Sequence, residues 1–188
     1  MRKLVYQMLT SLDGYFEGPG REIDWHNVDE EFNAYAINLL NNAGALLFGR
    51  VTYELMAGYW PKFSGGGSDA IVAERMNNLP KVVFSRTLMC IDWPNTRLVH
   101  SDAAAEVARL KQTPGQDLLM LASSDLAVSL LPHNLVDEFQ IIVNPVILGD
   151  GKSLFRGLDR RYRLKLVQAK PFSSGNVVLY YVPAPAAG

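Results

Sequence analysis

The segment SSDLAVSLLPHNLVDEFQIIVNPVILGDGKSLF, residues 123–155, decides the fold class of this 188-residue chain. Residues 125–131 have helical character and end at Pro132, because proline lacks the backbone N–H that would continue a helix. Residues 138–143, EFQIIV, follow as a largely apolar strand. A helix that leads into a buried strand is the repeating unit of α/β proteins.

The same alternation of strand and helix extends back toward the N-terminus. Short apolar runs predict strands at residues 3–10, 45–48, 81–84, 97–99 and 117–121. Helical spacing predicts helices at residues 29–41, from residue 51 onward, and at residues 70–77 and 103–111. Between them, the glycine-rich stretch at residues 63–69 is expected to be a flexible loop. Such alternation predicts a mostly parallel sheet with helices on both faces.

Two further strands are expected near the C-terminus. Residues 162–169 and 177–182 alternate in polarity and are separated by a turn that contains Pro171 and Gly175, which is typical of an antiparallel pair. No internal repeat or linker divides the chain. We therefore expect one α/β domain over residues 1–188, with about eight strands, counted from these patterns.

Composition argues against several classes of partner. The chain has 18 basic and 19 acidic residues, without the basic excess that nucleic-acid binding usually requires. No apolar run approaches the roughly 20 residues of a membrane span, so no membrane partner is expected. Cys90 is the only cysteine, which fits a reducing compartment, and the cytoplasm is the expected location. The three histidines lack metal-ligand spacing, so no metal is expected.

Three of the predicted strands end in a small, polar turn. These turns are Gly49-Arg50-Val51-Thr52, Ser85-Arg86-Thr87 and Ala122-Ser123-Ser124-Asp125. Ligands of open α/β sheets bind beyond the carboxyl ends of the strands, and helix N-termini there attract phosphate. Arginine adds fork-shaped donors for phosphate oxygens. Each turn alone fits a structural cap, but together they indicate a ligand with several phosphates, such as NADPH.

These segments resemble a known family. SLDGY (residues 11–15), LLFGRVTYE (46–54), VVFSR (82–86) and residues 123–155 are similar to the reductase domain at the C-terminal end of the bacterial riboflavin-biosynthesis deaminase/reductase (RibD). Dihydrofolate reductases share that fold. The segments occur in the family's order and span nearly the whole chain. The resemblance implies a dihydrofolate-reductase-like three-layer α/β/α sandwich in a stand-alone form, and a homodimer.

The resemblance also implies roles for the polar turns in binding NADPH. Gly49, Arg50 and Thr52 would hold cofactor phosphate, and Ser85 and Arg86 would contact the 2′-phosphate side of the adenosine. The pyrophosphate would be cradled by Ala122, Ser123, Ser124, Asp125 and Leu126. The family usually has glycine where this chain has Ala122. Alanine adopts a positive φ only at a cost, so this position departs from the pattern.

The substrate side departs from the pattern as well. Dihydrofolate reductases carry an acidic residue on the first helix, and that place falls near Asn33, whose amide cannot act as a carboxylate would. Asn33 is still predicted to bind substrate, as part of the wall that the first helix forms. Glu30, one turn earlier, is a candidate catalytic replacement. Asp13 is predicted to be catalytic and to bind substrate, or alternatively to cap its own turn. Trp25 is predicted to stack on a planar ring, or alternatively to pack as an apolar anchor.

The expected function is therefore NADPH-dependent hydride transfer to a small pterin-like or ribosylaminopyrimidine-like substrate. The alternative, which Ala122 and Asn33 favour, is a non-catalytic nucleotide-binding or interaction protein that retains the fold. The two C-terminal strands are rich in Leu, Val and Tyr and are the expected contact between two copies of the chain.

Overall fold

The computed structural model describes residues 1–185. The strands are β1 (Leu4–Thr10), β2 (Tyr15–Glu17), β3 (Ala43–Gly49), β4 (Lys81–Phe84), β5 (Thr96–Val99), β6 (Asp117–Leu121), β7 (Glu138–Val143), β8 (Lys152–Ser153), β9 (Leu164–Pro171) and β10 (Val177–Pro183). The helices are α1 (Glu30–Asn41), α2 (Arg50–Tyr59), α3 (Gly67–Asn78), α4 (Ala103–Gln112) and α5 (Ser124–Leu130), with short 3-10 turns at Trp60–Lys62 and Leu131–His133. The domain expected over residues 1–188 includes residues 186–188, which lie outside the described part.

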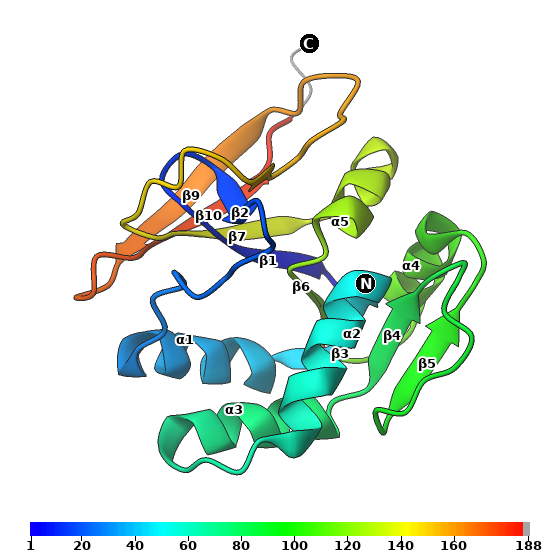
Figure 1. Cartoon of the computed structure of the whole chain (residues 1–188). Helices are drawn as coiled ribbons and strands as arrows, with labels where there is room; N and C mark the ends of the chain where they lie inside the picture. Colours follow the sequence, from blue (N-terminus) through cyan, green and yellow to red (C-terminus); the bar gives the residue numbers. More distant parts are fainter. Residues whose placement is uncertain (186–188) are drawn as a thin grey trace.

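Eight strands form one sheet in the order β5-β4-β3-β6-β1-β7-β10-β9. The pairs from β5 to β7 are parallel, whereas β10 runs antiparallel to both β7 and β9 (Figure 1). The predicted mostly parallel sheet with an antiparallel C-terminal pair is confirmed. The carboxyl ends of β1, β3, β4 and β6 consequently meet at one side of the sheet, where ligands of such sheets bind.

Helices cover both faces of the sheet. On one face, apolar residues of β1, β3, β4 and β6 pack against α4 and α5. On the opposite face, the alternate residues of the same strands pack against α1, α2 and α3. The two clusters follow from the pleat, because successive side chains of a strand point to opposite faces. The predicted three-layer α/β/α sandwich is therefore confirmed.

The first helix illustrates how the sequence specifies an element. Asp29 caps α1, and its carboxylate accepts a hydrogen bond of 2.7 Å from the Phe32 N–H. Tyr35 and Leu40 lie on the apolar stripe and are buried. The helix predicted at residues 29–41 is thus observed, with Asp29 as its cap rather than its first turn.

Three local expectations differ from the structure. Helix α3 begins at Gly67, inside the stretch expected to be a loop, and Gly67 has a positive φ of 68°, which glycine permits where the chain turns into the helix. Strand β9 starts two residues later than expected and runs to Pro171. The pattern gave no sign of the short antiparallel pair β2 and β8, which contains too few residues for a periodic signal.

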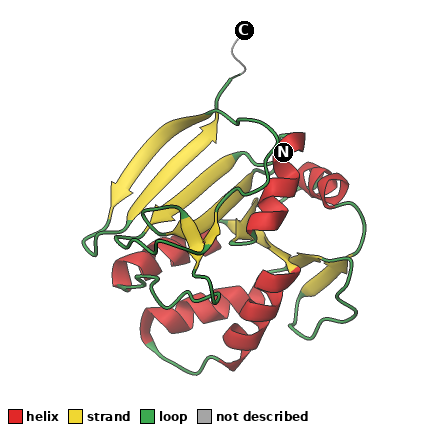
Figure 2. Ribbon diagram, turned by 45° about the horizontal axis from the view of Figure 1, so that its top comes forward, coloured by secondary structure: helices red, strands yellow, loops and turns green. Residues whose placement is uncertain are grey.

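The C-terminal strands extend beyond the helical layers. Every residue of β9 is exposed, and Figure 2 shows the β9–β10 pair at the margin of the sheet. Within residues 1–185, no helix is both long and apolar enough to cross a membrane.

Candidate active site

A cavity of about 1080 Å³ opens at the carboxyl ends of the parallel strands. Strand residues Leu9, Gly49, Phe84 and Leu121 form its floor, and α1, α2, α3 and α5 contribute walls. The loop between β2 and α1 supplies the remaining wall. The cavity thus lies where the topology of an open parallel sheet predicts a ligand.

Two of the polar turns are locked together beside this cavity. The Gly49 N–H donates a hydrogen bond of 3.0 Å to Ser123 Oγ, and the Ser123 N–H donates one of 3.1 Å to Thr52 Oγ1. Ser123 and Thr52 are both buried. These bonds hold the first turns of α2 and α5 in a fixed relation. Since the first N–H groups of a helix lack acceptors inside the helix, both turns offer donors to an anionic ligand.

The structure places most of the predicted cofactor residues on the cavity wall. The lining residues among them are Gly49, Arg50, Thr52, Ala122, Ser123, Ser124, Asp125 and Leu126. Ser85 and Arg86 follow Phe84 beyond the wall. Ser85 Oγ accepts hydrogen bonds from the Thr87 and Leu88 N–H groups and so closes its own turn.

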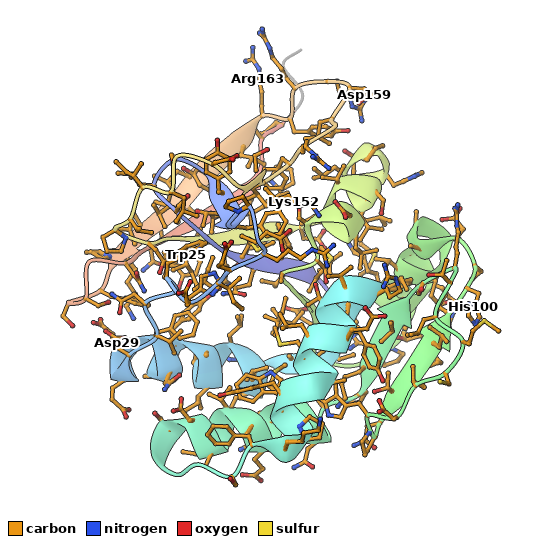
Figure 3. The ribbon with its side chains drawn as sticks, in the orientation of Figure 1. Trp25, Asp29, His100, Lys152, Asp159 and Arg163 are labelled. Atoms are coloured by element: carbon orange, nitrogen blue, oxygen red, sulfur yellow. The ribbon has the colours of Figure 1, made fainter. Side chains whose placement is uncertain are left out.

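Two cations stand beside these turns. Arg50 Nη1 lies 2.9 Å from the Glu54 carboxylate, and Nζ of Lys152, which Figure 3 labels, lies 3.2 Å from the Asp125 carboxylate. Ion pairs near the surface contribute little to stability, so a phosphate can replace the carboxylate of either pair at little cost. This end of the cavity therefore suits an anion. Within residues 1–185, no group of three or more His, Cys, Asp or Glu side chains could hold a metal ion.

The turn that leads into α5 is conformationally strained. Ala122 and Ser123 have φ angles of 50° and 57°, in the left-handed region that favours glycine. The Ala122 N–H donates a hydrogen bond of 2.9 Å to the Gln7 carbonyl, which fixes this turn to β1. The departure noticed at Ala122 is thus a residue held in an unfavourable conformation.

Replacing Ala122 with Gly is expected to raise the free energy of unfolding by about 0.5–1 kcal/mol, because glycine relieves the left-handed strain of roughly 1–2 kcal/mol at a smaller entropic cost. The same substitution at the exposed helical Ala105 should lower it by about 1 kcal/mol. Urea unfolding measures both. If Ala122→Gly also lowers the free energy of unfolding, Ala122 is not strained.

Asp13 is not among the residues that line the cavity. Its carboxylate accepts hydrogen bonds from the Leu148 N–H (3.2 Å) and the Gly149 N–H (2.8 Å), and so closes the neighbouring turn. The Ser11 side chain and these N–H groups lower the pKa of Asp13. These bonds match the alternative of a turn-capping aspartate, and the role of Asp13 in catalysis and substrate binding stays a prediction.

Glu30 and Trp25 also lie outside the cavity wall. Glu30 is exposed in the first turn of α1, where an acid is favourable to the helix dipole. Trp25 Nε1 donates a hydrogen bond of 3.0 Å to the Glu22 carbonyl, and its ring packs edge-on against His26 (Figure 3). The packing of Trp25 within its loop matches the alternative of an apolar anchor, whereas the catalytic role of Glu30 and the stacking of Trp25 on a substrate ring stay predictions.

Asn33 of α1 is paired with a carboxylate that the sequence did not predict at this site, that of Asp69 in α3. Asn33 is buried on the cavity wall, and its Nδ2 donates hydrogen bonds of 2.7 Å to Asp69 Oδ1 and 3.0 Å to Ser68 Oγ. Asp69 also lines the cavity. Sequence reasoning missed it because residues 63–69 were assigned to a flexible loop. The Ser-Asp pair at the start of a helical pattern is the signal that could have revealed a helix start there.

His26 supplies an uncharged imidazole to the wall formed by the loop between β2 and α1. Burial lowers its pKa to about 4, although a hydrogen bond with the Phe16 backbone favours the charged form. Its Nε2 has no hydrogen-bond partner within the part of the chain that the structure describes. At neutral pH the ring is therefore neutral.

Comparisons with known proteins identify the family that shares this arrangement. The family model described as the RibD C-terminal domain matches residues 2–178. The uncharacterised protein YyaP of Bacillus subtilis is 32% identical over 180 residues, which cover 96% of this chain and 94% of that protein.

Two solved structures share the fold. A putative riboflavin biosynthesis protein from Shewanella sp. PV-4 has a TM-score of 0.76 at 21% identity, covering 97% of this chain and 99% of that one. A diaminohydroxyphosphoribosylaminopyrimidine deaminase/5-amino-6-(5-phosphoribosylamino)uracil reductase from Thermotoga maritima has a TM-score of 0.70 at 17% identity. That match covers 97% of this chain and 57% of the bifunctional protein.

Proposed function

Because the chain belongs to the RibD C-terminal domain family, we propose that it is a reductase that uses NADPH to reduce a small pterin-like or ribosylaminopyrimidine-like molecule. The observation that carries the proposal is the pair of interlocked turns, Gly49–Thr52 and 122–126, on the wall of the cavity. They bring two helix N-termini and two cations to one end of it.

The residues at this end fit a dinucleotide with several phosphates. Arg50 and Lys152 would bind phosphate oxygens, together with the first N–H groups of α2 and α5. Arg86, at the end of β4, would bind the 2′-phosphate beyond the cavity wall. When bound, NADPH supplies the hydride. The protein orients the cofactor and the substrate and excludes water from between them.

The opposite end of the cavity would hold the substrate. Asn33 and Asp69 offer a paired amide and carboxylate, and His26 offers a neutral imidazole to the same cavity. A carboxylate and an amide can accept hydrogen bonds from ring N–H and amino groups of a nitrogen heterocycle. These groups would orient the substrate ring and hold its protons.

NADPH is expected to bind with a Kd about 10–150-fold lower than that of NADH, because losing a charge-assisted hydrogen bond costs roughly 1.5–3 kcal/mol. Nicotinamide fluorescence during titration measures both constants. Arg86→Ala should abolish the preference, whereas Arg75→Ala, an exposed arginine outside the cavity wall, should retain it.

Turnover is then assayed as NADPH oxidation with a panel of pterins and ribosylaminopyrimidines. Equal affinity of the wild type for NADH and NADPH would refute the cofactor assignment. Tight NADPH binding without turnover of any panel member would favour the alternative, a non-catalytic nucleotide-binding protein.

We also propose that two copies associate through the β9–β10 edge. Leu166 and Val167 of β9 are 49% and 62% exposed, which is unusual for an edge strand of a monomer. Light scattering at micromolar concentration should report twice the chain mass of 20.9 kDa. Val167→Lys is expected to yield the monomer, and a monomeric wild type would reject the contact.

The cytoplasm is the proposed compartment. Cys90 is exposed and free, and a reducing environment keeps such a thiol from oxidising. NADPH and its proposed substrates are soluble small molecules, so no membrane or nucleic acid is part of the proposal.

A further inference from the structure

The two ends of the cavity differ in chemistry. Its cationic side chains within residues 1–185 are Arg21, Arg50 and Lys152. Arg50 and Lys152 stand beside the cofactor turns and face Glu54 and Asp125. The wall formed by α1, α3 and the later turns of α2 has no lysine or arginine among its lining residues, and its one carboxylate is Asp69.

Most of this wall is apolar. Side chains from the three helices that line it are Phe32, Ala36, Leu39, Leu55, Met56 and Val72. A phosphate here would lose water and gain no cation, and burying an unpaired anion is strongly unfavourable. The negative charge of Asp69 adds repulsion.

The apolar surface continues onto the rim of the cavity. Five large apolar residues of the lining are exposed, namely Ile23 (38%), Val28 (51%), Val51 (45%), Leu55 (52%) and Tyr59 (54%). They come from the loop after β2 and from one side of α2. Contiguous exposed apolar residues around a cavity mark a surface that binds an apolar group.

Arg21 is the cation that the loop after β2 contributes to the cavity lining. It lies in the loop that also contributes Asp24 to the lining, and Glu17 of β2 lines the cavity beside them. The loop wall therefore has no net positive charge to offset the desolvation of a phosphate.

We propose that the half of the cavity between α1, α2 and α3 binds an apolar, unphosphorylated substrate. Its class is a planar nitrogen heterocycle with an apolar substituent, and not a sugar phosphate. The inference rests on the proposed function, because it takes the other half of the cavity to hold the cofactor. Of the two substrate classes proposed above, it favours the pterin-like molecules over the phosphoribosyl compounds.

The test uses two compounds that differ in one group. One probe is a diaminopyrimidine with a phenyl substituent, and the other is the same compound with a phosphate ester on the phenyl ring. Calorimetric titration into the full chain measures their Kd values with and without NADPH. We expect the unphosphorylated probe to bind at least about tenfold more tightly, because the phosphate finds no cation to replace its water.

Leu55→Ser should raise the Kd of the unphosphorylated probe about fivefold, because apolar contact at the rim is lost. Ile71→Ser is the matched control: Ile71 is 42% exposed on the adjacent helix α3 and does not line the cavity. Arg21→Ala should leave the preference between the probes unchanged. Thermal unfolding confirms that each variant is folded.

Equal or tighter binding of the phosphorylated probe would overturn the inference. So would equal effects of Leu55→Ser and Ile71→Ser, or a change in molecular mass in Leu55→Ser with unchanged probe affinity, which would make the rim a protein contact. The NADPH titration is independent of these outcomes. If NADPH fails to bind, the proposed function fails while the probe pair still reports on the apolar half.

Discussion

Replacing Lys81 with Met is expected to lower the free energy of unfolding by about 2–4 kcal/mol. Lys81 is 1% exposed, and its Nζ donates three hydrogen bonds, of 2.9 Å to the Met76 carbonyl, 2.9 Å to Asn77 and 2.7 Å to Leu79. These carbonyls belong to the C-terminal end of α3, where a helix has no internal donors left. Methionine fills the same volume but leaves these three carbonyls without a hydrogen-bond donor.

The charge of Lys81 matters for this interaction. Burial lowers the pKa of Lys81 to about 8, so the ammonium still predominates at pH 7. Helix α3 also carries Asp69 and Val72 of the cavity wall, so loosening its C-terminal end should weaken binding of the phenyl-substituted probe as well.

Lys62→Met is the control, because Lys62 is exposed and the change should stay within about 0.5 kcal/mol. Urea unfolding measures both variants. A difference in unfolding free energy between the two variants of less than about 1 kcal/mol would show that the carbonyls of α3 bond to water as well as to the Lys81 ammonium.

When the pH falls from 6.5 to 4, His26 is expected to cost the wild type up to about 3 kcal/mol of its free energy of unfolding. Replacing His26 with Gln should remove this loss. Burial lowers the pKa of His26 in the folded protein to about 4, from 6.5 in an exposed imidazole. Between these pH values the unfolded chain binds a proton at this site and the folded chain does not. Stability therefore rises as the pH increases through this window and is lost as the pH falls.

The measurement is the free energy of unfolding of wild type and variant at several pH values from 4 to 7. The free energy of unfolding of the wild type minus that of the variant should increase steadily from pH 4 to pH 6.5 and then level off. His133→Gln, at an exposed histidine, should follow the wild-type curve. Parallel curves for wild type and His26→Gln would show that the buried imidazole is not the cause.

The fold could be predicted from local patterns because each element has its own signal. Strand β3 is a short apolar run between glycines, and α1 has a cap at Asp29 followed by an apolar stripe. The order of the strands is a different matter. Neighbours such as β1 and β6 are more than a hundred residues apart, so only the resemblance to a family could indicate that they pair.

The candidate site was predicted in part for the same reason. The turns before α2 and α5 follow directly from the ends of buried strands, and the sequence places them correctly. Asp13 looked equally promising, yet its carboxylate is used by the backbone of Leu148 and Gly149, far along the chain. Asp69 reaches Asn33 across 36 positions. Spacing along the sequence does not report on such long-range contacts.

The central position of β1 has a consequence for how the chain is made. β1 lies between β6 and β7, and Leu4 pairs with Leu118 while Val5 pairs with Glu138. A ribosome that adds about 5–20 residues per second needs on the order of 5–20 seconds to pass from β1 to β6. During that interval β1 has neither neighbour, and the centre of the sheet can assemble only after β6 and β7 have been made. Folding is then governed by long-range contacts, which are slow to form.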